Sequence, residues 1–308
     1  MAVETFHTLI ARNKRNTWLL IVLFGMVFVG LGMLIGTAWI GDRRGGMGLA
    51  VIAGTVALVL TLASYYGGGA VLLGLSRARR IVKSDDPQLF NVVEELCLAG
   101  GLPMPQIYLI DDTAMNAFAT GRDPRHATVA ITTGLRTRLT RDELTGVIAH
   151  ELSHVRHYDI LFATLIAVMV GVLVMLCDVF LRSRWWGGSR RDSRDRGSQG
   201  GAVILVVVAI VLAIITPILA KIIQMAMSRQ REYLADAGAV ELTRNPYGLA
   251  GALAKLADDT EVLEVANRAT APLYIVSPIK KFEARASSIF STHPPIKDRI
   301  ERLLALTR

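Results

Sequence analysis

Residues 147–155 read Val-Ile-Ala-His-Glu-Leu-Ser-His-Val, with two histidines one helical turn apart. On a helix, His150 and His154 project from the same face. Two imidazoles in this arrangement can hold one Zn²⁺, with Zn–N distances of about 2.0–2.1 Å. Glu151 lies beside the first histidine, where it can reach a water molecule on the ion and take its proton as a general base. The stretch therefore predicts a helix that carries a hydrolytic zinc site.

A catalytic zinc of this kind needs a third protein ligand. One group of enzymes uses a third histidine shortly after the motif, but Ile160 occupies that position here. Residues 229–236 read Arg-Gln-Arg-Glu-Tyr-Leu-Ala-Asp and offer carboxylates instead. Glu232 and Asp236 would lie one turn apart on one helix face. Glu232 could then bind the ion, while Asp236 accepts a hydrogen bond from the far nitrogen of a bound histidine. Such a set of ligands suits zinc well.

The segment around the motif has the composition of a water-soluble α+β unit. Residues 85–100 repeat apolar side chains at helical spacing, which predicts an amphipathic helix. Residues 140–157 begin with Thr-Arg-Asp-Glu, a capping box that predicts where the motif helix starts. Residues 106–110 and 128–133 are short, β-branched and bounded by Pro, Gly and Asp, and we predict strands there.

Four apolar blocks indicate a membrane protein. The chain is 52% hydrophobic and only 19% charged, against about 25% charged residues in soluble domains. The first two blocks are long enough to cross a hydrocarbon core of about 30 Å as helices. We therefore predict a mainly α-helical membrane protein with four transmembrane helices. The blocks are residues 18–40, 47–75, 160–181 and 202–220.

The predicted spans divide the chain into four parts. These are an N-terminal segment and hairpin (1–75), a catalytic part with the motif helix (76–159), a second hairpin (160–220) and a C-terminal catalytic part with the third zinc ligand (221–308). The parts of the chain outside the predicted spans carry many Lys and Arg residues. Because such residues are enriched on the cytoplasmic side of membrane proteins, we predict that these parts face the cytoplasm. The Arg- and Gly-rich loop 182–201 would then violate the positive-inside rule. Either the second hairpin is not fully inserted, or the first spans override it.

The net charge of +8 has a membrane explanation. Lys and Arg commonly flank membrane spans and face anionic lipid. No basic motif with interleaved aromatic residues occurs, so we expect the lipid bilayer as a partner and no nucleic acid.

The chain resembles the HtpX-type integral membrane zinc metalloproteases, which belong to the gluzincin group together with the CAAX prenyl proteases. The resemblance covers about residues 17–308. It rests on His-Glu-Leu-Ser-His at 150–154 and on Ser-Arg-Gln-Arg-Glu-Tyr-Leu-Ala-Asp-Ala at 228–237. Two shorter matches are Asn-Ala-Phe-Ala-Thr-Gly at 116–121 and Thr-His-Pro-Pro at 292–295.

The resemblance implies a zincin-like α+β catalytic domain among the transmembrane helices. It implies one Zn²⁺ per chain, bound by His150, His154 and Glu232. Glu151 would be the catalytic base, and Asp236 would orient a zinc-bound histidine from behind.

Substrate-binding residues are also implied by the resemblance. Asn116 would bond the substrate backbone. Residues 130–133, including Ala130 and Thr132, would form an edge strand to which the peptide adds as an extra strand.

The expected reaction is hydrolysis of a peptide bond by an activated water in one step, without a covalent acyl-enzyme. The resemblance brings His293, together with Arg299, toward the oxyanion of the tetrahedral intermediate. Substrates would be membrane proteins or unfolded polypeptides. The family takes part in quality control and stress response in the bacterial cytoplasmic (inner) membrane, so we expect a multi-pass protein there with its catalytic site facing the cytoplasm.

Three other functions are weighed against this prediction. A protease specialised for a processed C-terminus, such as a prenylated CAAX tail, is disfavoured by four spans in place of a larger membrane barrel. A metal-binding membrane scaffold without turnover is disfavoured by the intact Glu151. A transporter would have only Asp178 as an acidic residue within its spans.

Overall fold

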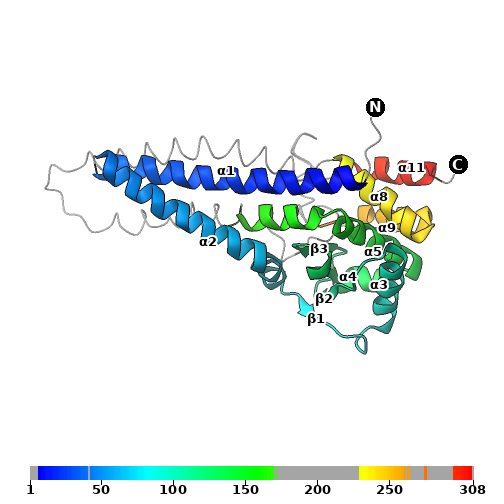
Figure 1. Ribbon diagram of the computed structural model, residues 1–308. Coiled ribbons are helices and arrows are strands. Elements are labelled where there is room, and N and C mark those ends of the chain that lie inside the picture. Colours follow the sequence, from blue (N-terminus) through cyan, green and yellow to red (C-terminus); the bar gives the residue numbers. More distant parts are fainter. Residues whose placement is uncertain are drawn as a thin grey trace.

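Two long helices form a hairpin that projects from a mixed α/β unit, as Figure 1 shows. Helix α1 covers Phe6–Ile40 and helix α2 covers Arg43–Leu75. Both contain stretches long and apolar enough to cross a membrane, Ile10–Thr37 and Arg43–Leu75. The structure is a computed structural model, and it describes residues 6–40, 42–169, 171, 229–259, 261, 263, 274–275 and 294–306.

The hairpin is closely packed and longer than its apolar blocks. A Cβ atom on Gly36 would lie 2.8 Å from the Cα atom of Gly46, so the two backbones touch where the helices meet. Helix α1 starts at Phe6, well before the apolar block at 18, so its first turns are polar. Helix α2 starts at Arg43, which leaves less of a turn between the helices than the sequence predicts.

The third apolar block begins as a helix over Asp159–Met169. Its residues Phe162 and Leu165 pack against Leu20 and Phe24 of α1. The rest of this block, the loop 182–201 and the fourth block lie outside the described residues. The described part therefore has two helices long enough to span a membrane, and the four-span arrangement stays a prediction.

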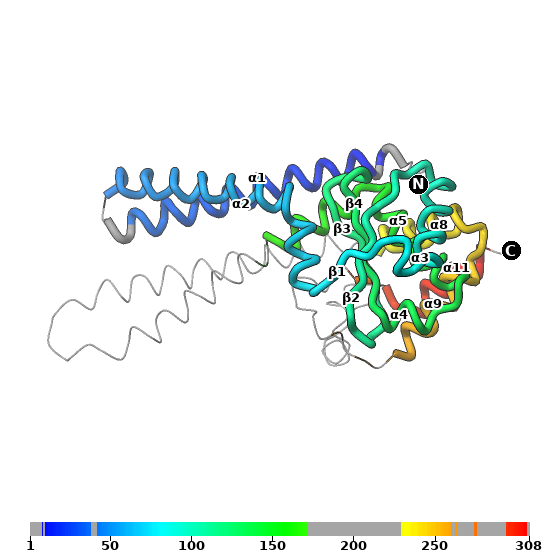
Figure 2. Tube along the Cα trace, turned by 90° about the horizontal axis from the view of Figure 1, so that it is seen from below, coloured from blue at the N-terminus to red at the C-terminus, as the bar shows by residue number. Residues whose placement is uncertain are grey.

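A four-stranded sheet lies beside the base of the hairpin (Figure 2). Its strand order is β1-β2-β4-β3. Strands β2 and β4 run parallel, and the two outer pairs run antiparallel. The strands are β1 (Arg79–Arg80), β2 (Gln106–Ile110), β3 (Ala117–Gly121) and β4 (Ala127–Thr132).

The predicted strands at 106–110 and 128–133 correspond to β2 and β4. The prediction that residues 130–133 form an edge of the sheet is wrong. Within β4, Ala130 stands opposite Tyr108 of β2 and also opposite Phe118 of β3. Ala130 and Thr132 are fully buried. A strand that is paired on both sides cannot accept a further strand, so the predicted peptide-binding edge over 130–133 does not exist. Within the described part of the sheet, β3 forms the edge next to β4.

Helices cover both faces of the sheet. On one face, Val129 and Ile131 pack against α3 and α5. On the other face, Phe118 and Ala130 pack against the end of α2 and the helix after α5. The α/β unit is therefore built directly on the base of the hairpin. The other elements of the described residues are α3 (Pro87–Gly100), η1 (Pro124–His126), α4 (Thr133–Arg138), α5 (Arg141–Arg156), α8 (Arg229–Thr243), α9 (Pro246–Asp258) and α11 (Ile296–Ala305).

The start of α5 confirms the predicted capping box. The Thr140 hydroxyl accepts a hydrogen bond from the backbone N–H of Glu143, and the Glu143 carboxylate accepts one from the backbone N–H of Thr140 at 2.8 Å. The helix ends at Arg156, and Tyr158 follows with a left-handed φ of 61°. The next helix begins at Asp159, directly after this turn. The turn therefore sets the direction in which the chain leaves the motif helix.

Candidate metal centre

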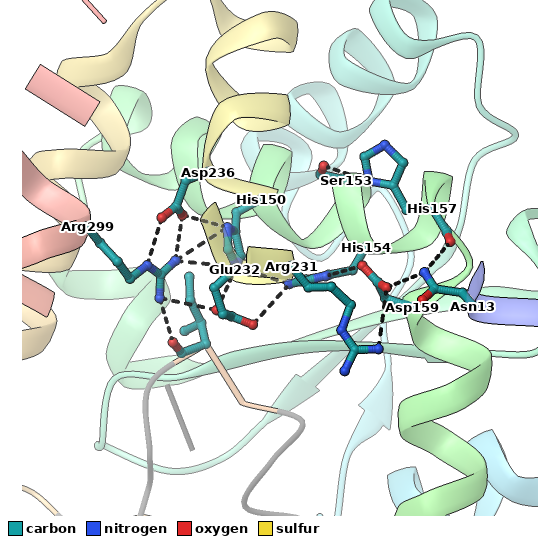
Figure 3. A network of polar contacts seen from close by, with 11 residues as sticks. Asn13, His150, Ser153, His154, His157, Asp159, Arg231, Glu232, Asp236 and Arg299 are labelled. Carbon is teal, nitrogen blue, oxygen red and sulfur yellow. Dashed lines mark hydrogen bonds and ion pairs between the residues drawn. The ribbon is translucent and has the colours of Figure 1, made fainter. Parts of the chain in front are cut away.

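Helices α5 and α8 bring three potential metal ligands together (Figure 3). His150 and His154 lie one turn apart on α5, and their Nε2 atoms are 3.2 Å apart. The Glu232 carboxylate on α8 lies 3.7 Å from Nε2 of His150 and 3.8 Å from Nε2 of His154. Their ligand atoms all lie within 4.8 Å of one another.

These distances fit a tetrahedral zinc site. Ligand atoms about 2.0–2.1 Å from a tetrahedral ion are about 3.3 Å from each other. The three observed separations lie close to that value. The set also has the composition expected of a catalytic site, because two histidines and one carboxylate leave a fourth position for water or substrate.

Each of the two histidines has a carboxylate behind it. Nδ1 of His150 lies 3.0 Å from Asp236 of α8, and Nδ1 of His154 lies 3.0 Å from Asp159. A carboxylate at Nδ1 holds the proton on that nitrogen, so the Nε2 lone pair points toward the centre. The sequence predicts such a role for Asp236. Nothing in the local sequence pattern places Asp159 next to His154.

Arg299 of α11 is buried beside these ligands, with no exposed surface. Its guanidinium donates to both oxygens of Asp236, at 2.9 and 2.6 Å. It also lies 3.5 Å from the Glu232 carboxylate. Burial opposes ionisation of Asp236, but the charge of Arg299 and the bonds to His150 and Arg299 keep the pKa of this carboxyl below its usual value. Arg299 thus ties α11 to α8 and α5.

Glu151 is also buried, on the side of α5 that faces the sheet. Burial disfavours the charged form of this carboxyl, whereas the nearby backbone of Ala119 in β3 favours it. Burial raises the pKa of Glu151 to about 7. A carboxyl with a pKa near neutral can both take up and release a proton at physiological pH.

The outward side of β3 already has partners within the chain. The carbonyl of Ala117 accepts a hydrogen bond from the N–H of Ile275 at 3.0 Å. The N–H of Gly121 donates to the hydroxyl of Thr164 at 3.4 Å. Strand β3 itself lies against α5, because Ala117 and Ala119 share a buried cluster with Ala149 and Leu152 of that helix.

The other predicted substrate residues have mixed outcomes. Asn116 is buried at the start of β3, where its side-chain oxygen accepts from the N–H of Ala117 and its backbone bonds the Thr132 hydroxyl. His293 lies outside the described residues.

His157, next to the turn after α5, is buried and points toward Ser153, away from the three ligands (Figure 3).

Comparisons with known proteins agree with this arrangement. The sequence pattern described as "Peptidase family M48" matches residues 83–307. A "Protease HtpX homolog" from Ligilactobacillus salivarius is 43% identical over 296 residues, covering 96% of this chain and 97% of that protein. Another from Thermoanaerobacter pseudethanolicus is 42% identical over 307 residues, covering 100% of both chains.

A solved structure shares the fold. The match is to "Crystal Structure of S. mikatae Ste24p", with a TM-score of 0.51 and 18% sequence identity. It covers 96% of this chain and 66% of that one. At this level of identity the likeness concerns the fold alone.

Proposed function

This chain belongs to peptidase family M48 and is a membrane metalloprotease, and on that premise we propose that it cleaves polypeptides with one zinc ion held by His150, His154 and Glu232. The observation that carries the proposal is the orientation of the two histidines. Both Nδ1 atoms face a carboxylate at 3.0 Å, so both Nε2 atoms are available to a metal next to Glu232.

Zinc bound at this position would polarise the scissile carbonyl and lower the pKa of a water molecule. Glu151 takes the proton from the attacking water and passes it to the leaving amine. In the metal-free protein burial raises its pKa to about 7, so this group takes up and releases a proton near neutral pH. The backbone of Ala119 in β3 lies beside the Glu151 carboxylate. Arg299 keeps Asp236 and Glu232 in place, and His293 stabilises the oxyanion, as the resemblance implies.

The substrate would lie along β3 rather than along β4. Among the described residues, strand β3 pairs with β4 on one side only, and the backbone of its Ala119 lies beside the proposed base. An extended peptide adds to such an edge through backbone hydrogen bonds, which makes recognition largely independent of sequence. The N–H of Ile275 occupies the carbonyl of Ala117, and the Thr164 hydroxyl occupies the N–H of Gly121, so a peptide that runs the length of β3 displaces both bonds.

We also propose where the enzyme acts. The metal centre lies at the base of the apolar hairpin, because the helix that follows α5 packs against α1. Unfolded segments of membrane proteins would reach such a site, which supports a role in quality control at the bacterial cytoplasmic membrane. The basic residues next to both described spans support the proposal that the catalytic part lies on the cytoplasmic side of the membrane.

The experiment is turnover by the purified full-length protein. The protein is prepared in detergent under chelation to suppress self-cleavage, and Zn²⁺ is then added with an unfolded casein as substrate. Glu151→Gln is measured in parallel, with Glu241→Gln on the exposed side of α8 as a matched control. We expect Glu151→Gln to lower kcat by about 100- to 10,000-fold, the usual contribution of a general base.

Zinc binding is measured on the same samples. Loss of cleavage in Glu151→Gln with zinc binding retained, and normal cleavage in Glu241→Gln, would support the proposal. Full activity in Glu151→Gln would refute the assigned base. Cleavage that is equal with and without zinc would refute the metal mechanism.

A further inference from the structure

The polar start of α1 reaches the metal centre. Asn13 and Thr17 are buried in this segment, whereas Lys14 and Arg15 between them are exposed. The Thr17 hydroxyl bonds the carbonyl of Asn13 in its own helix. The Asn13 side chain instead leaves its helix and points toward the turn after α5 (Figure 3).

Both hydrogens of the Asn13 amide have acceptors in the catalytic part. Nδ2 donates to the backbone carbonyl of His157 at 2.9 Å and to Oδ1 of Asp159 at 2.6 Å. His157 is the C-cap of α5, so its carbonyl is one that no later turn of this helix can use. An amide nitrogen carries two donors, and this site uses two.

Asp159 connects Asn13 to His154, one of the proposed metal ligands. Its Oδ2 lies 3.0 Å from Nδ1 of His154, while Oδ1 accepts from Asn13 and lies 4.0 Å from the guanidinium of Arg231. Asp159 fixes the ring of His154 only if its own carboxylate is fixed. One of its oxygens is held by a residue that lies 146 positions earlier in the sequence.

We propose that Asn13 is a positioning residue for His154, acting through Asp159, so that the helix leading into the first apolar stretch is part of the metal centre. The inference rests on the proposed zinc site. Without the Asn13 amide, the Asp159 carboxylate loses a charge-assisted hydrogen bond and can rotate. The ring of His154 then spends less time with Nε2 aimed at the ion, and zinc affinity falls.

The test is zinc affinity of the full-length protein in detergent, measured by competition with a chelator. Asn13→Leu removes both donors and keeps the number and branching of the side-chain heavy atoms. Partners one step removed from a metal typically change affinity about 10- to 100-fold, and Asn13 acts through one more residue, so we expect a loss of about tenfold. Asn16→Leu, one turn later on the same helix, is the control and should bind zinc as the wild type does.

A double-mutant cycle separates positioning from general support of the fold. In an Asp159→Ala background, Asn13→Leu should cause no further loss of zinc affinity, because the residue that transmits its effect is gone. An equal loss in both backgrounds would overturn the proposal, as would unchanged affinity in Asn13→Leu alone. If Asn13→Leu is not recovered folded, Asn13→Ser is measured through the same cycle and judged by the same outcomes. Failure of the wild type to bind zinc would refute the proposed function itself. That outcome is distinct from a failure of the proposed role of Asn13, in which the wild type binds zinc.

Discussion

At the scale of single residues, the site depends on which nitrogen of each histidine is free. Asp236 and Asp159 both face Nδ1, and the two Nε2 atoms face each other at 3.2 Å. Two bare nitrogen lone pairs repel at that distance, so a cation or a proton must lie between them. Burial lowers the pKa of His154, but the hydrogen bond with Asp159 and the charge of Glu232 outweigh burial and raise it to about 9.

This pKa predicts that zinc competes with a proton. Below about pH 9 the metal-free His154 is protonated, and the proton must leave before the ring can bind a metal. We expect zinc affinity to fall by about tenfold for each unit of pH below that value, as one proton is displaced. Chelator competition at a series of pH values from about 6 to about 8 measures the slope.

Asp159→Asn provides the comparison. The substitution removes the charge that raises the pKa of His154, so zinc affinity of the variant should depend less on pH than that of the wild type. The explanation fails if the wild-type affinity does not change with pH over this range.

Residues from distant segments are the part of the site that the sequence does not predict. His150, Glu151 and His154 can be recognised because they share one helix, and Glu232 and Asp236 because they share another. Asn13 and Asp159 have no such pattern, since their contact depends on how α1 packs beside the turn after α5. The resemblance implies that Arg299 approaches the oxyanion, and the structure shows its guanidinium bonded to Asp236.

At the scale of elements, the motif helix is fixed by close backbone contacts. Helix α5 packs against α9 through Gly146. A Cβ atom at this position would lie 2.5 Å from the backbone nitrogen of Leu249 and 2.8 Å from its Cα atom. Backbone atoms cannot rotate away as side chains can, so α9 would have to move. Glycine is therefore required here by packing, not by its conformational freedom.

Gly146→Ala should lower the free energy of unfolding by about 1–3 kcal/mol, the usual cost of overpacking a core. Helix propensity alone would predict the opposite sign, because alanine favours a helix by about 1 kcal/mol over glycine. Thermal unfolding of the metal-free protein in detergent distinguishes the two.

Gly251→Ala in α9 is the matched control. A Cβ there would meet only the side chain of Glu143, at 3.2 Å or more. The control should be neutral or slightly stabilising. A Gly146→Ala protein as stable as the control would show that α5 and α9 have more room than the structure indicates.

Elements with strong local signals are those that the sequence predicts well. The amphipathic pattern at 85–100 gives α3, and the capping box gives the start of α5. The sequence does not predict strand β3, because Ala-Phe-Ala-Thr-Gly lacks a β-branched run. The error about the sheet edge has another cause. Strand order depends on pairing between segments far apart in the chain, and no local pattern in residues 130–133 reports it.

At the scale of the whole molecule, the hairpin and the catalytic part share their packing. The helix after α5 contacts α1, and the sheet contacts the end of α2. The two ends of the hairpin should therefore lie on opposite sides of the membrane, with the catalytic part on the side of Lys83. Arg44, near the start of α2, would lie on the other side.

Single cysteines test this orientation in intact cells. The natural Cys97 and Cys177 are first replaced by alanine. A membrane-impermeant maleimide should then label Arg44→Cys in intact cells, but should label Lys83→Cys only after the cells are opened. The reverse pattern would place the catalytic part outside the cytoplasm, and labelling of both in intact cells would argue against a spanning hairpin.

The central claim is that His150, His154 and Glu232 hold the catalytic metal, and zinc stoichiometry tests it most directly. The full-length protein is loaded with Zn²⁺, dialysed against a weak chelator and analysed for metal per chain, together with Glu232→Ala and Glu241→Ala. We predict about one zinc per chain in the wild type and in Glu241→Ala, and far less in Glu232→Ala. Equal zinc content in all three proteins, or none in the loaded wild type, would contradict the assignment.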